Sequence, residues 1–233
     1  MLTTNGHKTH HSARVILFLG APGSGKGTQS AWLSSQLGIP CLSTGEILRS
    51  EAKRNTPAGF RLRQILASGS LVSDSMVCAV VGSRLRRDVP TDGLILDGFP
   101  RTAEQAVYLD RLLADLGLPL PTAIHLHVSH DVLLRRLTAR RQCAVCGAVY
   151  NLLSRPSLRG SRCENDGGAL IERDDDSEGV VLRRLTEFDN SLAPLIDYYR
   201  GGDYHLIDGD RDPQAIADEL LDIVTAEELC LTA

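Results

Sequence analysis

Short apolar runs recur along the chain, and longer stretches with helical periodicity separate them. The runs are RVILFLG (14–20), GLILDG (93–98), AIHLHV (123–128) and YHLIDG (204–209), with a weaker one at Ile39–Leu42. Near-continuous apolar runs that end in glycine or polar turns are typical of parallel strands covered on both faces. Their alternation with amphipathic stretches predicts an α/β fold, in which a doubly wound, five-stranded parallel sheet lies between two helical layers.

The stretches between these runs predict helices. They cover Lys26–Leu37, Gly45–Lys53, Ala58–Ser68, Asp74–Arg87, Ala103–Leu116, Asp131–Arg141, Glu178–Tyr199 and Pro213–Ala226. The segment from Arg141 to about Asp176 breaks this alternation, because it is rich in Gly, Ser, Asn, Asp and Cys and has no helical period. An insertion of this length in a compact domain is normally functional or cross-linked on its own.

Composition and charge narrow the function classes. A chain of 233 residues with 42% hydrophobic content can build one substantial core. Its net charge of -4 gives no sign of a nucleic-acid backbone or an anionic membrane as main partner. No apolar run approaches the length of a membrane span, and residues 1–13 lack the apolar centre of a signal peptide. We therefore expect a cytoplasmic protein with a disordered extension at 1–13.

The first apolar run is followed by a glycine-rich loop, GAPGSGKGT (20–28). The pattern G-x-x-x-x-G-K is matched by Gly20, Gly25 and Lys26, while Gly27 takes the usual hydroxyl position and Thr28 follows one residue late. Such a loop turns its backbone N–H groups inward at a helix N-terminus, where they surround nucleotide phosphates. The alternative is a glycine-rich turn with an exposed lysine, and the motif alone does not separate a transferase from an ATPase or GTPase.

A second motif, DGFPRT (97–102), ends another apolar run. A carboxylate at the carboxyl end of a strand beside a phosphate loop is suited to hold Mg²⁺ with its water shell, which is the role expected for Asp97. Arg101 would stand over the same crevice. The alternative for Asp97 is a plain turn-forming residue.

The segments GAPGSGKGTQ (20–29), STGEILR (43–49) and DGFPRT (97–102) together resemble the nucleoside monophosphate kinases, and most closely the long-lid bacterial adenylate kinases. The resemblance covers nearly the whole chain from Arg14 to about Leu220. It implies reversible, direct in-line transfer of the terminal phosphoryl group of Mg-ATP to AMP, giving two ADP, with a role in adenine nucleotide homeostasis. It also implies a monomer that binds ATP, AMP and ADP, and no nucleic acid or membrane.

The resemblance divides the chain into parts. The core P-loop kinase domain would comprise 14–42, 74–139 and 177–233, with a mobile AMP-binding arm at 43–73 and an inserted lid at 140–176. The arm and lid would be the moving parts, because closure has to exclude water before transfer.

The resemblance also assigns roles to residues. ATP would be bound by Gly23, Ser24, Gly25, Lys26, Gly27, Thr28, Arg136, Arg140 and Arg211. AMP would be bound by Thr44, Arg49, Leu71, Val72, Gly98, Arg101, Gln105, Arg173 and Arg184. The catalytic set would be Lys26, Asp97, Arg101, Arg140, Arg173 and Arg184. Any single arginine could instead belong to a solvated helix face, but phosphoryl transfer between two polyanions needs concentrated donors.

Gln105 bears on the choice of substrate, because the resemblance matches it to the glutamine that hydrogen-bonds the adenine edge of AMP. Uridylate and cytidylate kinases resemble this pattern but typically carry asparagine there, so Gln105 and Thr44 favour AMP. Another monophosphate kinase stays an alternative. Two alternatives come from other functional classes. One is a zinc-containing module that binds nucleotide without transferring a phosphoryl group, and the other is a P-loop ATPase.

The segment that breaks the alternation carries a metal-ligand pattern, Cys143-x2-Cys146-x16-Cys163-x2-Asp166. Two such pairs can place their ligands on a tetrahedron, and thiols in a reducing cytoplasm serve as metal ligands rather than disulfides. Some adenylate kinase lids resemble this set of three cysteines and one aspartate. We expect a structural Zn²⁺ that takes no part in the chemistry, and the alternative is a lid with unoccupied cysteines or another metal.

Overall fold

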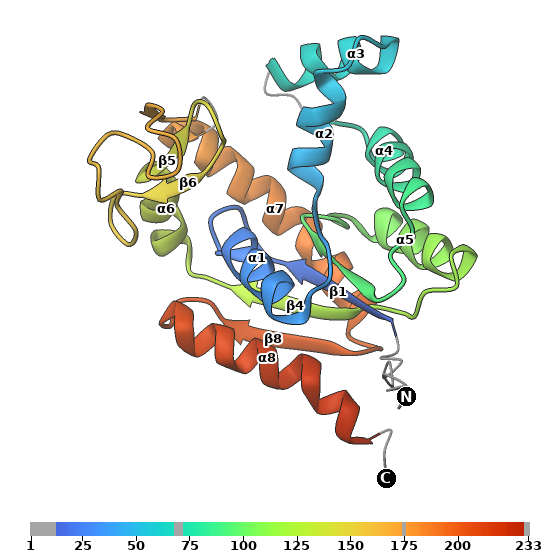
Figure 1. Ribbon diagram of the computed structural model, residues 1–233. Coiled ribbons are helices and arrows are strands. Elements are labelled where there is room, and N and C mark those ends of the chain that lie inside the picture. The colour runs from blue at the N-terminus through green and yellow to red at the C-terminus, as the bar shows by residue number, and fades with distance from the viewer. Residues whose placement is uncertain (1–12, 68–71, 174–175, 231–233) are drawn as a thin grey trace, which may run out of the picture.

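A parallel sheet forms the centre of the molecule in the computed structural model, which describes residues 13–67, 72–173 and 176–230 (Figure 1). Its strands, in spatial order, are β2 (Cys41–Ser43), β3 (Gly93–Asp97), β1 (Arg14–Leu19), β4 (Thr122–His127) and β8 (Tyr204–Asp208). All four strand pairings are parallel. The predicted five-stranded parallel sheet is therefore confirmed, and the weakest strand lies slightly later than Ile39–Leu42.

Helices cover both faces of this sheet. The helices in the described residues are α1 (Lys26–Leu37), α2 (Thr44–Ala52), α3 (Pro57–Ala67), α4 (Asp74–Arg87), α5 (Ala103–Asp115), α6 (His130–Thr138), α7 (Glu178–Tyr199) and α8 (Pro213–Cys230), of which α3 lies beyond α2, away from the strands (Figure 1). None of the helices in the described residues is long and apolar enough to cross a membrane.

The core consists of two main apolar clusters on opposite faces of the sheet. Ile16 and Phe18 of β1 pack with residues of α1 and α8, whereas Leu17 and Leu19 pack with residues of α4, α5 and α7. Successive side chains of a strand point to opposite faces, so a strand buried on both sides must be apolar throughout. This explains the uninterrupted apolar run from which the strand was predicted.

The predicted ends of two helices are wrong: α8 runs on to Cys230 instead of ending at Ala226, and α6 ends before Arg141. Helix α6 ends at Thr138, and Arg140–Cys143 forms β5 rather than the last turn of a helix reaching Arg141. In a small antiparallel sheet β5 pairs with β6 (Val149–Asn151) and β7 (Leu170–Ile171). Arginine and glutamine favour helices locally, but pairing with strands distant in sequence decides their conformation here. The insertion thus has secondary structure of its own.

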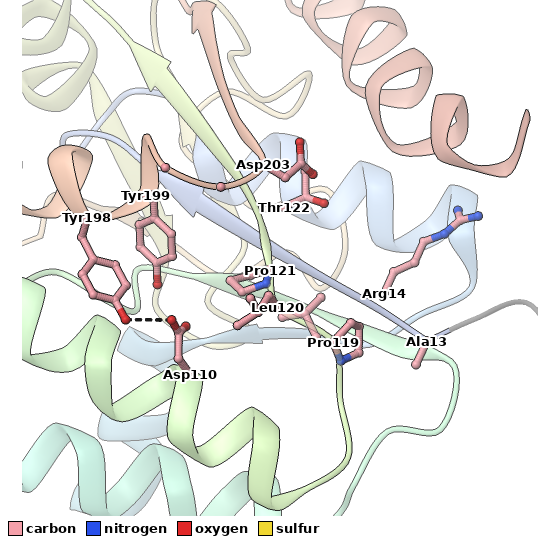
Figure 2. A pocket seen from close by; sticks show the side chains of 13 residues that line it. Ala13, Arg14, Asp110, Pro119, Leu120, Pro121, Thr122, Tyr198, Tyr199 and Asp203 are labelled. Carbon is pink, nitrogen blue, oxygen red and sulfur yellow. Dashed lines mark hydrogen bonds between the residues drawn. The ribbon is translucent and has the colours of Figure 1, made fainter. Parts of the chain in front are cut away.

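A cavity of about 580 Å³ lies at the amino ends of β1 and β4 (Figure 2). Tyr198 and Tyr199 line it together with Asp110, and Tyr198 Oη donates a hydrogen bond to Asp110 Oδ2 at 2.7 Å. The glycine-rich loop follows the opposite, carboxyl end of β1. Ligands of open α/β sheets bind beyond the carboxyl ends of the strands, so this cavity is separate from the expected phosphate site.

Candidate functional site

The glycine-rich loop connects the end of β1 to the start of α1. Gly25 forms the N-cap of α1 with φ of 100°, a left-handed conformation that favours glycine. Lys26 Nζ donates to the carbonyl oxygens of Gly20 at 2.7 Å and Ala21 at 2.8 Å, so the ammonium lies inside the curve of the loop. The Ser24 hydroxyl is buried and has no hydrogen-bond partner among the described residues. A cation, an unpartnered hydroxyl and a helix N-terminus together suit an anion.

Charged groups from separate segments surround Lys26. Its pKa is lowered to about 8, chiefly by burial; the carboxylate of Asp97 raises it, and the positive charges of Arg101, Arg184 and Arg140 add to the lowering. A Cβ added to Gly27 would lie 3.5 Å from Asp97 Oδ2, so that carboxylate faces the first turn of α1. The fold thus brings these residues of the expected catalytic set to the loop.

The segment that begins with α2 contains other expected binding residues. Thr44 is buried at the first position of α2. Arg49 folds back over the same helix, because a Cβ at Gly45 would lie 3.0 Å from its Nη1 atom. Val72 packs against the core cluster that contains Leu48. Leu71 lies outside the described residues.

Gln105 is buried at the N-terminal turn of α5. Its Oε1 accepts a hydrogen bond from the backbone N–H of Arg101 at 2.8 Å, and its Nε2 donates to Asp74 Oδ1 at 2.7 Å. Arg101 Nε in turn donates to the carbonyl oxygen of Gly98 at 3.0 Å. The expected base-contacting residue is therefore held by the segment that carries DGFPRT.

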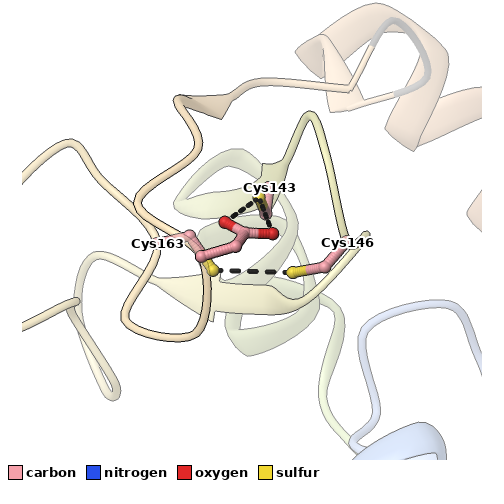
Figure 3. A group of neighbouring side chains, drawn as sticks. Cys143, Cys146 and Cys163 are labelled. Atoms are coloured by element: carbon pink, nitrogen blue, oxygen red, sulfur yellow. Dashed lines mark hydrogen bonds between the residues drawn. The ribbon is translucent and has the colours of Figure 1, made fainter.

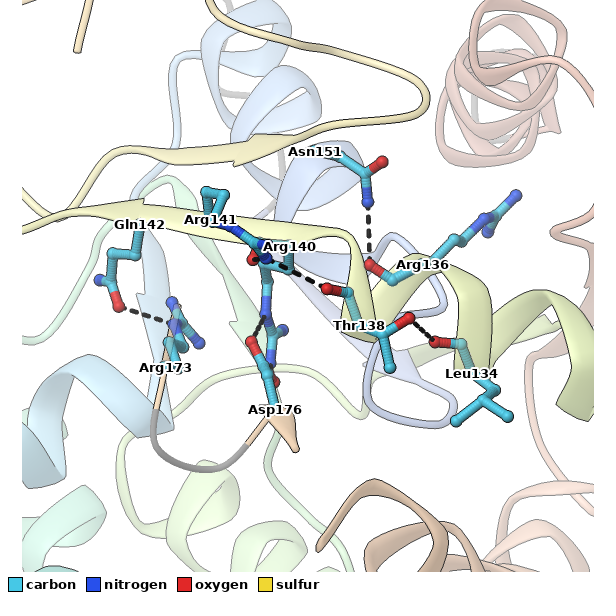
Figure 4. A network of polar contacts seen from close by, with 9 residues as sticks. All are labelled: Leu134, Arg136, Thr138, Arg140, Arg141, Gln142, Asn151, Arg173 and Asp176. Carbon is cyan, nitrogen blue, oxygen red and sulfur yellow. Dashed lines mark hydrogen bonds and ion pairs between the residues drawn. The ribbon is translucent and has the colours of Figure 1, made fainter. Parts of the chain in front are cut away.

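The two arginines at the borders of the insertion are bound to partners within the chain (Figure 4). Arg140 Nε donates to Asp176 Oδ2 at 2.7 Å, and its Nη2 pairs with Oδ1 of the same carboxylate. Arg173 Nε donates to Gln142 Oε1 at 2.6 Å. In this arrangement both guanidinium groups are directed to neighbours in the insertion.

Arg136 and Arg211 lie next to the loop that follows β8. Arg136 Nη2 donates to the carbonyl oxygen of Gly209 at 3.0 Å, and Arg211 Nε donates to the carbonyl oxygen of Asp208 at 3.1 Å. Arg211 also pairs with Glu219 of α8. The structure brings these two arginines to one loop.

Three cysteines and an aspartate come together in the insertion (Figure 3). The potential ligand atoms of Cys143, Cys146, Cys163 and Asp166 all lie within 4.8 Å of one another. Cys143 Sγ is 3.3 Å from Asp166 Oδ1, and the Sγ atoms of Cys146 and Cys163 are 3.6 Å apart. Hydrogen bonds from the Cys146 thiol and the Gly168 amide lower the pKa of Asp166 to about 2, so it is a carboxylate.

The surrounding backbone fits this cluster closely. Gly147 N donates to the Cys143 carbonyl at 3.1 Å and Gly167 N to the Cys163 carbonyl at 2.9 Å, so both ligand pairs have the same turn. A Cβ on Gly168 would lie 2.8 Å from Cys143 Sγ and 3.0 Å from Asp166 Oδ1. The group could hold a metal ion, and thiolates with one carboxylate suit tetrahedral zinc.

Some residues of the site were not singled out by the sequence analysis. Asp74 accepts a hydrogen bond from the expected site residue Gln105, and Tyr150 Oη lies 3.3 Å from Cys163 Sγ. Asp74 is the first residue of α4, where an acid is common because it complements the helix dipole. The contact of Asp74 with Gln105 could therefore not be predicted from the position of Asp74 in the sequence.

Comparisons with known proteins point to one family. The family model described as "Adenylate kinase" matches residues 18–203. A protein named adenylate kinase from Thermodesulfovibrio yellowstonii is 44% identical over 184 residues, which cover 79% of this chain and 86% of the relative. One from Nitrosococcus oceani is 43% identical over 206 residues, or 88% and 94% of the two chains. One from Thermosipho melanesiensis is 40% identical over 210 residues, or 90% and 98%.

Proposed function

The chain belongs to the adenylate kinase family, and we propose that it transfers the terminal phosphoryl group of Mg-ATP directly to AMP, reversibly, giving two ADP. One observation carries this proposal above the others. Lys26 lies inside the glycine-rich loop at the N-terminus of α1, and the charges of Arg101, Arg140 and Arg184 reach it from three other segments.

Phosphoryl transfer requires little covalent chemistry from the protein. Charge in the transition state spreads over the equatorial oxygens of the transferred group, so positioning and electrostatic stabilisation supply the rate. Lys26 and the arginines would bind these oxygens, and no side-chain nucleophile is needed. Asp97, whose carboxylate faces Gly27, would hold Mg²⁺ through its water shell, and the ion would neutralise charge on the phosphates.

We further propose that residues 140–176 form a lid over the core and that 43–73 form the AMP-binding arm. Arg140 and Arg173 donate to Asp176 and Gln142, so the N–H groups in these contacts would have to change partners to reach phosphate oxygens. Closure of the lid would supply that change and would exclude water, which otherwise accepts the phosphoryl group.

The metal in the insertion is proposed to be structural Zn²⁺. Apart from the ligand cysteines, Tyr150 is the buried residue of the apolar cluster there, and Ala148 and Leu170 pack against it. So small a core provides little hydrophobic stabilisation, and a bound metal replaces it. Four protein ligands leave no open position for a reacting water.

The wider physiology remains a set of predictions. These are a cytoplasmic location, a monomeric state, a role in adenine nucleotide homeostasis, and the absence of nucleic-acid and membrane partners.

The test is a coupled assay of ADP formation from Mg-ATP with AMP, GMP, CMP or UMP, and with no acceptor. We expect strong turnover with AMP alone. Lys26→Met should lower kcat at least about 100-fold with an unchanged melting temperature, since it removes a charge that acts in the transition state. Turnover with a different monophosphate would keep the mechanism but change the assigned acceptor nucleotide. ATP loss without an acceptor would instead indicate a hydrolase.

A further inference from the structure

Asp74 joins the start of α4 to the start of α5. Its Oδ2 accepts a hydrogen bond from Thr102 Oγ1 at 2.6 Å, and its Oδ1 accepts one from Gln105 Nε2 at 2.7 Å. Gln105 is only 3% exposed, and its Oε1 accepts from the backbone N–H of Arg101 at 2.8 Å. The amide of Gln105 is thus held at both of its polar atoms.

These two partners permit one orientation of the amide. A backbone N–H can only donate, and an ionised carboxylate can only accept. A half-turn of the Gln105 amide would place its NH₂ against the N–H of Arg101 and its oxygen against the carboxylate of Asp74, so both hydrogen bonds would become repulsive contacts. In the observed orientation, Oε1 keeps a second lone pair and Nε2 keeps a second hydrogen for a ligand.

We propose that Asp74 fixes the orientation of the Gln105 amide and thereby makes the acceptor site select 6-aminopurines over 6-oxopurines. This inference rests on the proposed function, in which Gln105 contacts the base of the acceptor nucleotide. Adenine presents a donor at N6 beside an acceptor at N1, whereas hypoxanthine presents an acceptor at O6 beside a donor at N1. A fixed amide matches only one of these patterns, and an amide free to rotate matches both. Asp74 is a positioning residue in this scheme.

The test compares AMP with inosine monophosphate, which differ at this edge of the base. In Asp74→Asn the new side chain can offer Gln105 either a donor or an acceptor, so of the two contacts that oppose a half-turn of the amide only the one with the Arg101 N–H remains. We expect the ratio of kcat/KM for AMP to kcat/KM for inosine monophosphate to fall at least about tenfold, with inosine monophosphate turnover retained or increased. Asp74→Ser, whose hydroxyl also donates or accepts, is a second variant should Asp74→Asn fold poorly.

Thr102→Val is the matched control. It removes the hydrogen bond to the other oxygen of Asp74 and the N-cap of α5, but leaves the contact between Asp74 and Gln105. Its melting temperature should fall while the substrate ratio stays near that of the wild type. A merely structural role of Asp74 would lower stability in all three variants and leave the ratio unchanged.

An unchanged ratio in the Asp74 variants, or an equal fall in Thr102→Val, would overturn the inference while leaving the proposed function in place. A wild-type protein that fails to phosphorylate AMP would overturn the proposed function, and this inference with it.

Discussion

Arg140 and Asp176 form a bidentate ion pair across the base of the insertion (Figure 4). Arg140 begins β5, and Asp176 lies just before α7, so the pair joins the two ends of the segment that would move as a lid. The Asp176 residue is fully buried. A buried carboxylate depends on its partner, because no water replaces the lost charge contact.

Asp176→Asn should therefore destabilise the protein by about 3 kcal/mol, since it leaves the Arg140 guanidinium without its counter-charge. Urea unfolding of the two proteins measures the difference. Glu172→Gln is the control, because the ion pair of Glu172 with Arg141 spans 3.7 Å and half of the Glu172 side chain is exposed. That change should cost less than about 1 kcal/mol. An equal decrease in the free energy of unfolding in the two variants would contradict the larger contribution expected of the buried ion pair.

Lys26 should make ATP binding depend on pH. Its pKa is lowered from 10.5 to about 8, so the free protein loses this proton as the pH rises through about 8. Polyphosphate next to the ammonium favours the charged form and raises the pKa again. Binding must then take up a proton near pH 8.5, and ATP affinity must fall as the pH rises above about 8.

Calorimetric titration with Mg-ATP at pH 8.5 in two buffers of different ionisation enthalpy measures this uptake. Lys26→Met should show a smaller uptake, because the titrating group is gone. Equal proton uptake in the wild type and the variant would remove Lys26 as its source.

Removal of the metal ligands should affect stability more than chemistry. Replacing Cys143 and Cys146 together by serine should abolish stoichiometric zinc and lower the melting temperature by about 5 °C or more, with a smaller loss of activity at low temperature. Metal analysis and a melting curve test this. Cys41→Ser changes a half-buried cysteine outside the cluster and should retain the metal. Unchanged metal content in the double variant would exclude these cysteines as ligands.

Gly168→Ala tests how closely the backbone fits the metal cluster. The new methyl group would lie 2.8 Å from Cys143 Sγ and 3.0 Å from Asp166 Oδ1, so the ligands must move. Zinc affinity, measured by competition with a chelating dye, should fall about tenfold or more. Gly179→Ala is the control, because nothing lies within 4 Å of a Cβ there. Wild-type affinity in Gly168→Ala would show that the cluster tolerates displacement.

Local patterns predicted most of the architecture because each depends on neighbours in the chain. The apolar run of β1 follows from burial on both faces, and α1 has the predicted bounds, Lys26–Leu37, since glycines flank it at both ends. The end of α6 was not predictable in this way. Strand β5 exists because Arg140 and Gln142 pair with Asn151 and Val149, and local preference favours a helix there.

The sequence by itself determined the alternation of strands and helices, the glycine-rich loop and the spacing of the metal ligands, because short-range chemistry specifies each of them. Only the tertiary structure decided which groups meet across long separations. Asp74 holds Gln105, Asp176 holds Arg140, and charges from three segments converge on Lys26. Contacts of this kind depend on how distant elements pack together. In the sequence, a carboxylate at a helix start looks the same whether it caps the helix or orients a side chain 31 residues away.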